Sequence, residues 1–491
     1  MTVEFHPGPL LMVDIPGKTL EPATAAFLQR ERIRAVCLFR KNLGTEAEVR
    51  ALVRSLRAVL GPRALIGLDQ EGGSVVRSTF LPQAPSAMAL GATGDDALAE
   101  QVGAAVARGL RSLGLNWNFA PVVDVNNNPA NPVIAERAFS DDPDTVARLA
   151  GAWMRGSLRE GVACCLKHFP GHGDTHVDSH LALPTVDKSR AELDALELRP
   201  FKALCATAPA VMTAHIVYPQ IDPDHPATLS PKVLKGILRD EWGYDGVVIT
   251  DALMMKAIAE RYGYTRAPVM AIEAGADLVL AQGRLAEQQQ AVDALRAAFA
   301  SGRLSPQQGE RAQARLDALA EAYPSTPGEY PADTRAADDA LMHRAWAHGL
   351  LALRGAQPLG RSTPLRVIVQ ADVPTDMVSE AGPTALQALA LFDGFHDVKR
   401  LVLDDIDTLR WAQVPQDGRV NVLVSTRRHR YEAAVDWRPD LHLALWNPFQ
   451  ALDVPGPALV TWGYAQGALH AAQAWLEGRE PAPGHALATL N

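Results

Sequence analysis

Short apolar runs and amphipathic segments alternate along roughly the first 300 residues of the chain. Each apolar run ends in a polar or charged residue, and a segment with helical spacing of its apolar positions follows. Eight runs occur, at residues 10–15, 35–39, 64–68, 116–125, 162–169, 211–216, 246–250 and 277–280. Short, mostly apolar runs separated by helices are typical of parallel strands. The pattern therefore predicts an α/β fold, a (β/α)8 TIM-like barrel.

The segments between the runs predict helices wherever apolar residues recur every three or four positions. The clearest candidates are residues 46–60, 96–113, 144–159, 189–206, 230–240 and 286–300.

The pattern changes after Ala322. Residues 323–331 hold three prolines and predict a linker, and residues 336–353 predict a helix. Five further short apolar runs follow, at residues 365–369, 401–403, 420–424, 441–445 and 458–461. We therefore predict a catalytic barrel over residues 1–322, a linker and connecting helix over 323–364, and a smaller α/β sandwich domain over 365–491. We interpret Trp446 as the end of a core strand rather than part of a loop that reaches the barrel.

Composition narrows the class of protein. The 491 residues are 47% hydrophobic and 21% charged, which is typical of a globular protein, and the net charge of −9 with no basic block argues against nucleic-acid binding. The first residues have neither a basic region nor a long apolar run, so we expect no signal peptide and no membrane span. Four cysteines, mostly in apolar runs, predict buried free thiols and a cytoplasmic protein.

Polar residues at the ends of the apolar runs are the first candidates for chemistry. They are Asp14, Asp69, Asp124, Lys167 with His168, His215 and Asp251. The carboxyl ends of the strands form the active-site face of a barrel, so these side chains are expected to lie at that face. A polar residue at the end of a single run is as easily a structural cap. Polar residues at the ends of six runs favour a functional role.

The segment from Leu166 to His180, LKHFPGHGDTHVDSH, holds the densest group of ionisable residues. It can be a solvated surface loop, a metal site or an acid–base site. Four histidines recur every four residues, a spacing of zinc ligands on a helix, but Pro170 and two glycines argue against a helix. In the third alternative Asp178 orients His180, whose ring exchanges a proton near neutral pH.

The stretch from Lys167 to Thr175, KHFPGHGDT, followed by Asp178-Ser179-His180, resembles the signature of glycoside hydrolase family 3 β-N-acetylglucosaminidases of the NagZ type. The resemblance implies that His180 is the general acid/base and that Asp178 orients it. It also implies that Lys167 and His168 bind the terminal sugar. In that pattern His176 falls at a variable position, so the four-histidine spacing is accidental and we assign no metal.

Three further stretches carry the same resemblance. Residues 68–77, LDQEGGSVVR, imply that Asp69 and Arg77 bind sugar; Gly72 and Gly73 are expected to form a tight turn, and Ser74 stands where the family usually has arginine. After the landmark NWNFAPVVDV at 116–125, Arg137 matches a sugar-binding arginine, for which the alternative is a structural salt bridge. Ala135 replaces a common glycine. In the last stretch, 246–255, Asp251 matches the nucleophile.

The resemblance implies a retaining exo-β-N-acetylglucosaminidase, without a cofactor, that acts on a small carbohydrate or muropeptide. The alternatives are a β-N-acetylglucosaminide phosphorylase, a β-glucosidase of the same fold, a zinc-dependent hydrolase using the histidine segment, and a non-catalytic sugar-binding protein. NagZ-type enzymes often have a single domain, so the C-terminal part is a departure. Since both catalytic candidates and every sugar-binding candidate lie between Asp69 and Asp251, residues 365–491 are expected to supply no catalytic residue.

Overall fold

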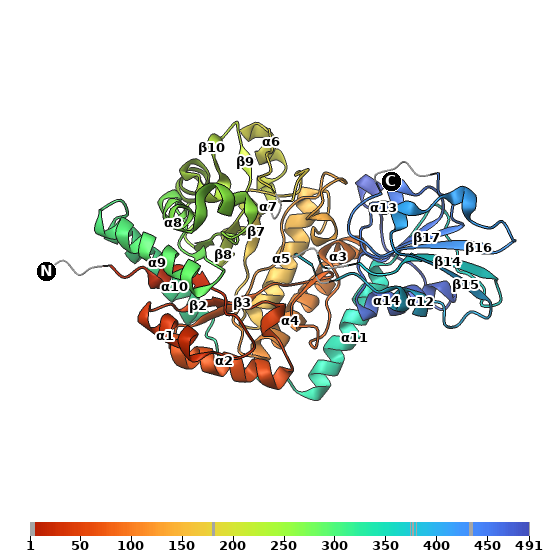
Figure 1. The fold of residues 1–491 in the computed structure, drawn as a ribbon, viewed down its shortest axis with the longest axis horizontal. Helices are drawn as coiled ribbons and strands as arrows, with labels where there is room; N and C mark the ends of the chain where they lie inside the picture. Colours follow the sequence, from red (N-terminus) through yellow and green to blue (C-terminus); the bar gives the residue numbers. More distant parts are fainter. Residues whose placement is uncertain are drawn as a thin grey trace.

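The structure, a computed structural model, describes residues 5–178, 182–373, 375, 378–379, 381–431 and 436–490. The first two thirds of the chain, coloured red to green in Figure 1, lie on one side of the molecule, and the last third, coloured blue, lies on the other. Both parts combine strands and helices, so the chain has a mixed α/β fold. None of the described helices is long and apolar enough to cross a bilayer.

Each of the eight apolar runs in the first part overlaps one strand. These strands are β1 (Leu11–Val13), β2 (Ala35–Cys37), β3 (Leu65–Leu68), β6 (Trp117–Asn118), β7 (Leu166–Phe169), β8 (Ala210–Thr213), β11 (Val247–Ile249) and β12 (Val279–Leu280). They form two parallel sheets, of order β12-β1-β2-β3-β6 and β11-β8-β7. Isolated parallel bridges join the two sheets at both ends, Trp117 to Ala163 and Val122 to Lys167 on one side and Ile249 to Leu278 on the other.

Helices connect the strands of the first part, as the apolar spacing predicts. They are α1 (Pro22–Arg30), α2 (Glu46–Leu60), α3 (Ala87–Thr93), α4 (Asp96–Ser112), α5 (Pro143–Arg159), α6 (Arg190–Ala195), α7 (Leu198–Leu204), the π-helix η5 (Lys232–Glu241), α8 (Lys256–Ala274), α9 (Leu285–Ala300) and α10 (Pro306–Ala322). Helix α2 illustrates the cause: Thr45 and Glu48 form a capping box at its start, and an apolar stripe from Val49 to Leu60 is buried. The single helix predicted over 189–206 is instead two helices, α6 and α7.

Two antiparallel pairs lie beside the parallel strands. Strands β4 (Gln70–Gly72) and β5 (Val75–Val76) form a hairpin directly after β3, and β9 (Val217–Tyr218) pairs with β10 (Asp222–Pro226) after β8. Gly72 and Gly73, with φ of 113° and 60°, make the tight turn expected of them.

The second part contains a six-stranded sheet of order β13-β18-β17-β16-β14-β15. Its strands are β13 (Leu351–Leu353), β14 (Leu365–Gln370), β15 (Val398–Leu403), β16 (Val420–Ser425), β17 (Leu441–Ala444) and β18 (Ala458–Val460). The predicted helix over 336–353 ends earlier than expected: α11 (Ala332–Gly349) stops at Gly349, and β13 pairs antiparallel with β18. The helices beside this sheet are α12 (Ala385–Ala390), α13 (Gln450–Asp453) and α14 (Gln466–Leu476).

The two faces of this sheet are buried in different cores, because successive side chains of a strand point to opposite faces. Val367 and Val369 of β14 pack with residues of α12 and α14, whereas Ile368 packs with Tyr431 and Trp437.

Candidate active site

The polar residues that follow the parallel strands lie at one edge of the sheets. Asp14 follows β1, Asp69 follows β3, His215 lies just beyond β8, and Asp251 follows β11 after one intervening threonine. Lys167 and His168 lie within β7 rather than beyond it. Because the strands are parallel, their carboxyl ends meet at the same edge, as the sequence predicts for these residues.

Five of the candidate and neighbouring residues form a continuous chain of buried ion pairs. Lys167 Nζ lies 2.7 Å from Asp69 Oδ1 and 2.6 Å from Glu71 Oε1. Arg137 donates hydrogen bonds to both carboxylate oxygens of Glu71, at 2.8 and 2.9 Å. Arg77 Nη2 lies 3.5 Å from Asp69 Oδ2. The structure therefore brings together four predicted sugar-binding residues, and the salt bridge considered as an alternative for Arg137 is present.

Charge pairing, rather than burial, sets the ionisation of this chain. Burial alone would raise the pKa of the Glu71 carboxyl, but Arg137 and Lys167 hold that pKa well below its usual value. Burial would lower the pKa of Lys167, but Asp69 and Glu71 raise it instead. Asp69, Glu71 and Lys167 are thus charged at neutral pH, and the site offers both cationic donors and carboxylate acceptors to a polyhydroxyl ligand.

Local hydrogen bonds fix the loop that carries Asp69, Glu71 and Arg77. The Asn118 side chain accepts from Gln70 N and donates to Gln70 O, both at 3.0 Å. The Gln70 side chain in turn accepts from Arg77 N and Ser78 N, each at 3.0 Å. A Cβ atom on Gly72 would lie 2.3 Å from Pro85 O, so glycine is required for this close approach.

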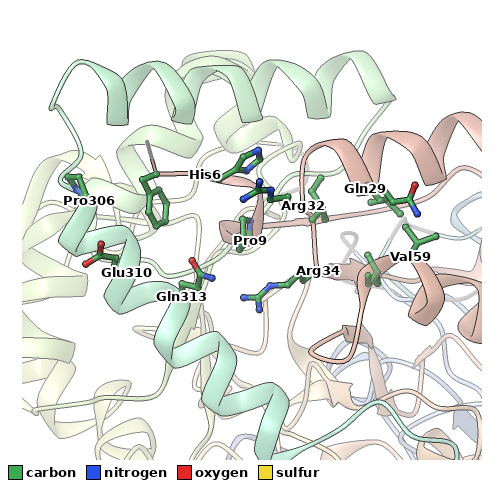
Figure 2. A pocket seen from close by; sticks show the side chains of 13 residues that line it. His6, Pro9, Gln29, Arg32, Arg34, Val59, Pro306, Glu310 and Gln313 are labelled. Atoms are coloured by element: carbon green, nitrogen blue, oxygen red, sulfur yellow. The ribbon is translucent and has the colours of Figure 1, made fainter. Parts of the chain in front are cut away.

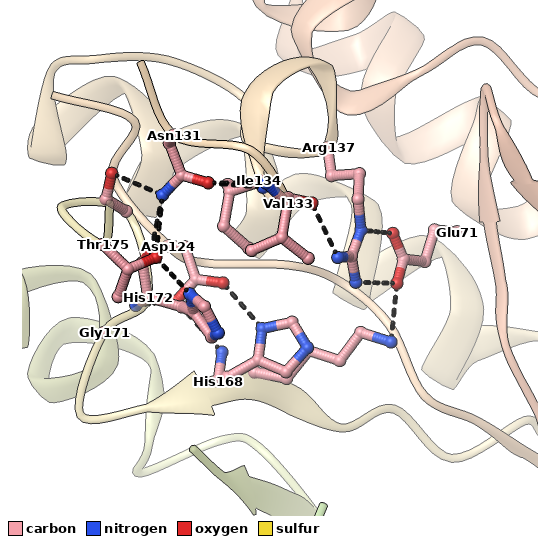
Figure 3. A network of polar contacts seen from close by, with 12 residues as sticks. Glu71, Asp124, Asn131, Val133, Ile134, Arg137, His168, Gly171, His172 and Thr175 are labelled. Carbon is pink, nitrogen blue, oxygen red and sulfur yellow. Dashed lines mark hydrogen bonds and ion pairs between the residues drawn. The ribbon is translucent and has the colours of Figure 1, made fainter. Parts of the chain in front are cut away.

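A second network, shown in Figure 3, centres on Asp124, whose side chain is fully buried. Its Oδ2 lies 2.7 Å from His168 Nδ1, and its Oδ1 accepts from the backbone N–H groups of His168 and His172, at 3.1 and 2.7 Å. Asn131 donates to the carbonyls of His172 and Gly173, both at 2.9 Å. These contacts anchor the segment after β7 to the segment after β6. Since Asp124 engages Nδ1, only Nε2 of His168 lacks a partner among the described residues.

His172 is buried between these groups. Its Nδ1 lies 2.9 Å from Thr175 Oγ1, which itself donates to the His172 carbonyl at 3.2 Å. Burial, aided by the charge of His168, lowers the pKa of His172 to about 4. The ring is therefore neutral at pH 7 and has a structural role in the loop.

Asp251 is only partly buried, and its Oδ1 accepts from the next backbone N–H at 2.7 Å. Burial raises the pKa of the Cys165 thiol, the charges of Asp69 and Asp251 raise it further, and Lys167 opposes them. The buried Cys165 thiol thus lies close enough to Asp251 and to the ion-pair chain for their charges to affect its pKa. His215, the neighbouring strand-end residue, is held by Thr228 Oγ1 at 2.8 Å and by the Ala252 carbonyl at 2.9 Å.

The predicted acid/base pair is only half described. Asp178 is described and partly buried, whereas His180, with Ser179, lies outside the described residues. From Pro170 to Asp178 the chain forms turns rather than a helix, so the four-residue spacing does not place the histidines on one helical face. Within the described ranges no three His, Cys, Asp or Glu side chains are grouped to hold a metal ion.

Sequence reasoning missed two members of the site. Glu71 links Arg137 to Lys167, and Asn131 holds the loop after β7. The only signal for Glu71 was its position directly after a strand end, beside two glycines. Asp124 was noted at a run end, but its anchoring of two histidine backbones was not predicted.

A cavity of about 540 Å³ lies at the opposite edge of the parallel strands. Figure 2 shows its lining by His6, Pro9, Gln29, Arg32 and Arg34, which precede the starts of β1 and β2, and by residues of α10. None of the candidate site residues lines it.

Comparison with known proteins gives one consistent result. Residues 2–319 match the glycosyl hydrolase family 3 N-terminal domain. A β-hexosaminidase from Neisseria meningitidis serogroup C is 37% identical over 293 residues, which cover 58% of this chain and 81% of that protein. β-Hexosaminidase A from Pseudoalteromonas piscicida is 39% identical over 286 residues, which cover 53% of this chain but only 48% of that protein.

The match to a solved structure extends over both parts of the chain. A glycoside hydrolase family 3 β-N-acetylglucosaminidase from Paenibacillus sp. str. FPU-7 is 34% identical and superposes with a TM-score of 0.89. The superposition covers 99% of this chain and 98% of that one, so the six-stranded sheet is shared as well.

Proposed function

The chain belongs to glycosyl hydrolase family 3 and is a glycoside hydrolase, and we propose that it is a retaining, exo-acting β-N-acetylglucosaminidase. It removes terminal, non-reducing β-linked N-acetylglucosamine, with peptidoglycan fragments as natural substrates. The observation that carries the proposal is the chain of ion pairs from Arg77 to Arg137, at the strand edge where Asp251 emerges. The similarity to a β-N-acetylglucosaminidase over nearly the whole length supports the substrate class.

In the proposed reaction Asp251 attacks the anomeric carbon and forms a glycosyl ester, while His180 donates a proton to the departing oxygen. His180 then takes a proton from water, which attacks the anomeric carbon and releases Asp251. Asp178 orients the imidazole. Most retaining glycosidases use two carboxyl groups, whereas a histidine is cationic as the acid and neutral as the base, and so places no second negative charge beside the nucleophile.

The proposed sugar-binding groups are Asp69, Arg77, Arg137, Lys167 and His168. Their pairing supports this role, because ion pairs fix the direction of each donor and acceptor before substrate arrives. His168 contributes Nε2, since Asp124 engages Nδ1.

We also propose that the eight parallel strands close into a (β/α)8 barrel and that the chain divides into a barrel (1–322), a connecting segment (323–364) and an α/β sandwich (365–491). The bridges that join the two parallel sheets support closure, and β13 extends the sandwich sheet into the connecting segment. A cytoplasmic location is proposed because all four cysteines are buried free thiols.

The test is hydrolysis of nitrophenyl β-glycosides of N-acetylglucosamine, N-acetylgalactosamine and glucose, with and without inorganic phosphate. We expect the N-acetylglucosaminide to be cleaved fastest, the β-anomer of the free sugar to appear first by NMR, and phosphate to change neither. Faster cleavage of the glucoside would contradict the substrate, release of the α-anomer first would contradict retention, and formation of the sugar 1-phosphate would identify a phosphorylase.

A further inference from the structure

The two parts of the molecule share one apolar core. Met88 and Ala89 of α3 and Val133 and Ile134 of the loop before Arg137 are buried in one cluster with residues of β17 and β18. In Figure 1 the blue sheet lies beside α3. The loop that carries Arg137 is therefore packed against the C-terminal part, and the polar contacts across this boundary bear on the site.

These polar contacts come from loops at the carboxyl ends of three parallel strands. Val378 and Ser379 follow β14, Arg428 follows β16, and Trp446 follows β17. The carboxyl edge of the six-stranded sheet thus faces the loops that carry Arg77 and Arg137. Trp446, which the sequence suggested was only a core strand end, does reach the first part of the chain: its indole N–H donates to Glu136 Oε1 at 2.9 Å.

Arg428 makes two of these contacts. Its Nη2 donates to the carbonyl oxygen of Val133, which also accepts from Arg137 Nη1 at 3.0 Å. Its Nη1 donates to Ser379 Oγ at 3.0 Å. Arg428 is only 3% exposed, so its charged group is held between the two parts of the chain.

A chain of hydrogen bonds continues from Ser379 toward Glu136. Ser379 Oγ donates to Ser74 Oγ at 3.2 Å, and Ser74 Oγ donates to Glu136 Oε1 at 2.6 Å. Glu136 is fully buried, and its Oε2 has no hydrogen-bond partner among the described residues. A buried carboxylate is costly unless donors compensate it, so the donors at Oε1 are important to the stability of this loop. Both of them, Ser74 and Trp446, depend on the C-terminal part.

The other sugar-binding arginine is held in the same way. Arg77 Nη1 donates to the carbonyl oxygen of Val378 at 2.9 Å, while its Nη2 faces Asp69. The two ends of the ion-pair chain, Arg77 and Arg137, are therefore both held by the C-terminal part. Arg77 donates directly to Val378, and Arg137 shares the Val133 carbonyl with Arg428.

We propose that the carboxyl edge of the C-terminal sheet is a positioning surface for the sugar site, and that Arg428 is its main positioning residue. Arg428 holds the Val133 carbonyl against Arg137 and starts the hydrogen-bond chain to Glu136, the neighbour of Arg137. This inference rests on the proposed function for the sugar-binding role of the two arginines. It does not place Arg428 in contact with substrate.

The experiment compares Arg428→Met, Arg428→Lys and Trp446→Phe with wild type in hydrolysis of nitrophenyl β-N-acetylglucosaminide. Loss of ground-state positioning raises KM more than it lowers kcat. We expect Arg428→Met to raise KM about tenfold or more, with kcat within about threefold. Lysine can reach only one of the two acceptors, so Arg428→Lys is expected to give an intermediate KM. Trp446→Phe removes the indole N–H and leaves a smaller aromatic ring, so a smaller rise is expected.

Arg427→Met is the matched control. Arg427 neighbours Arg428, but its guanidinium pairs with Asp407 of the C-terminal part, at 2.7 and 2.8 Å, and lies over the Tyr431 ring. The same substitution there should leave KM unchanged. An equal rise in KM for both variants would show a general loss of structure and would overturn the proposal.

Amide hydrogen exchange tests the proposal independently of activity. Arg428→Met should speed exchange in peptides that cover residues 72–78 and 133–138, and leave β1 to β3 as protected as in wild type. Unchanged KM and unchanged exchange would overturn the proposal. If Arg428→Met does not fold, unchanged values in both Arg428→Lys and Trp446→Phe overturn it. An inactive wild type would refute the proposed function alone, because the exchange measurement still decides whether Arg428 positions these loops.

Discussion

Lys167 and Glu71 form an ion pair of 2.6 Å inside the protein, with the Lys167 side chain only 2% exposed. A second carboxylate, Asp69, lies 2.7 Å from the same ammonium group. The Lys167 charge therefore holds together two carboxylates that would otherwise repel each other at the candidate sugar site.

Replacement of this lysine should destabilise the whole protein as well as the site. Lys167→Met leaves two buried carboxylates short of one cation, so we expect the free energy of unfolding to fall by about 3–5 kcal/mol. Urea unfolding at pH 7 measures this change. The control is Lys202→Met at an exposed position, which should change the free energy of unfolding by less than about 0.5 kcal/mol.

A double-mutant cycle separates the charge from the loss of packing. Adding Glu71→Gln to Lys167→Met removes the carboxylate that has lost its ammonium partner, so the double variant should be more stable than the sum of the single changes predicts. Simple additivity would contradict the interpretation that Lys167 acts through Glu71.

The nucleophile assignment predicts a loss of turnover without a loss of fold. Asp251→Ala should reduce activity on every substrate to below about 1% of wild type, since the glycosyl ester cannot form. Asp251 is partly exposed, so the melting temperature should change little. Added azide should occupy the vacated space, attack the anomeric carbon and yield the α-glycosyl azide.

Asp245→Ala is the matched control for this variant. Asp245 precedes β11, at the opposite end of the strand from Asp251, and pairs with Arg315 at 2.7 Å. It should keep full activity. Substantial turnover by Asp251→Ala, or a β-azide product, would be incompatible with the assignment.

The acid/base assignment predicts a dependence on the leaving group. Alkyl glycosides require protonation of the departing oxygen, whereas nitrophenolate leaves without it. His180→Ala should therefore slow alkyl N-acetylglucosaminides about 10²-fold more than the nitrophenyl substrate, and Asp178→Ala should act in the same direction more mildly. The control is His176→Ala, because His176 is exposed; it should change the rate of hydrolysis of neither substrate. If His180→Ala slowed both substrates equally, the acid would have to be another group.

Local patterns predicted the elements of this protein well, and contacts between distant segments account for what they missed. The run at 116–125 contains only the two-residue strand β6, and beyond Pro121 its pairing continues as the single bridge of Val122 to Lys167. Strand β13 is only three residues long and is defined by its pairing with β18, more than a hundred residues away.

The same limit applied within the site. The strand ends that carry Asp69, Lys167 and Asp251 were visible in the sequence, because apolar runs mark buried strands. Ser74 was noted only as a departure from the family's usual arginine, yet it donates to Glu136 and accepts from Ser379, which lies 305 positions later in the sequence. Ala135 was noted as a replacement for glycine, and its φ of 41° shows why glycine suits that position.

His172 predicts how stability changes with pH. Its pKa is lowered from 6.5 to about 4 in the folded protein, so the unfolded chain binds the proton more tightly. The contribution of His172 to the free energy of unfolding is therefore fully present above about pH 6.5 and is lost progressively as the pH falls toward 4. At about 1.4 kcal/mol for each pKa unit, the loss amounts to about 3 kcal/mol.

Chemical unfolding at pH 7.0 and at pH 4.5 in wild type and His172→Asn tests this prediction. The asparagine amide can take over the hydrogen bond to Thr175 but does not titrate, so the variant should lose less stability between the two pH values than wild type. The buried carboxylates Asp69 and Glu71, whose pKa values are lowered, also lose stabilisation on acidification, and they do so equally in both proteins. The charge of His172 also lowers the pKa of Asp124, so the difference between the two proteins reports the His172 ring together with its effect on Asp124. Identical losses would show that this ring does not control the acid sensitivity of the fold.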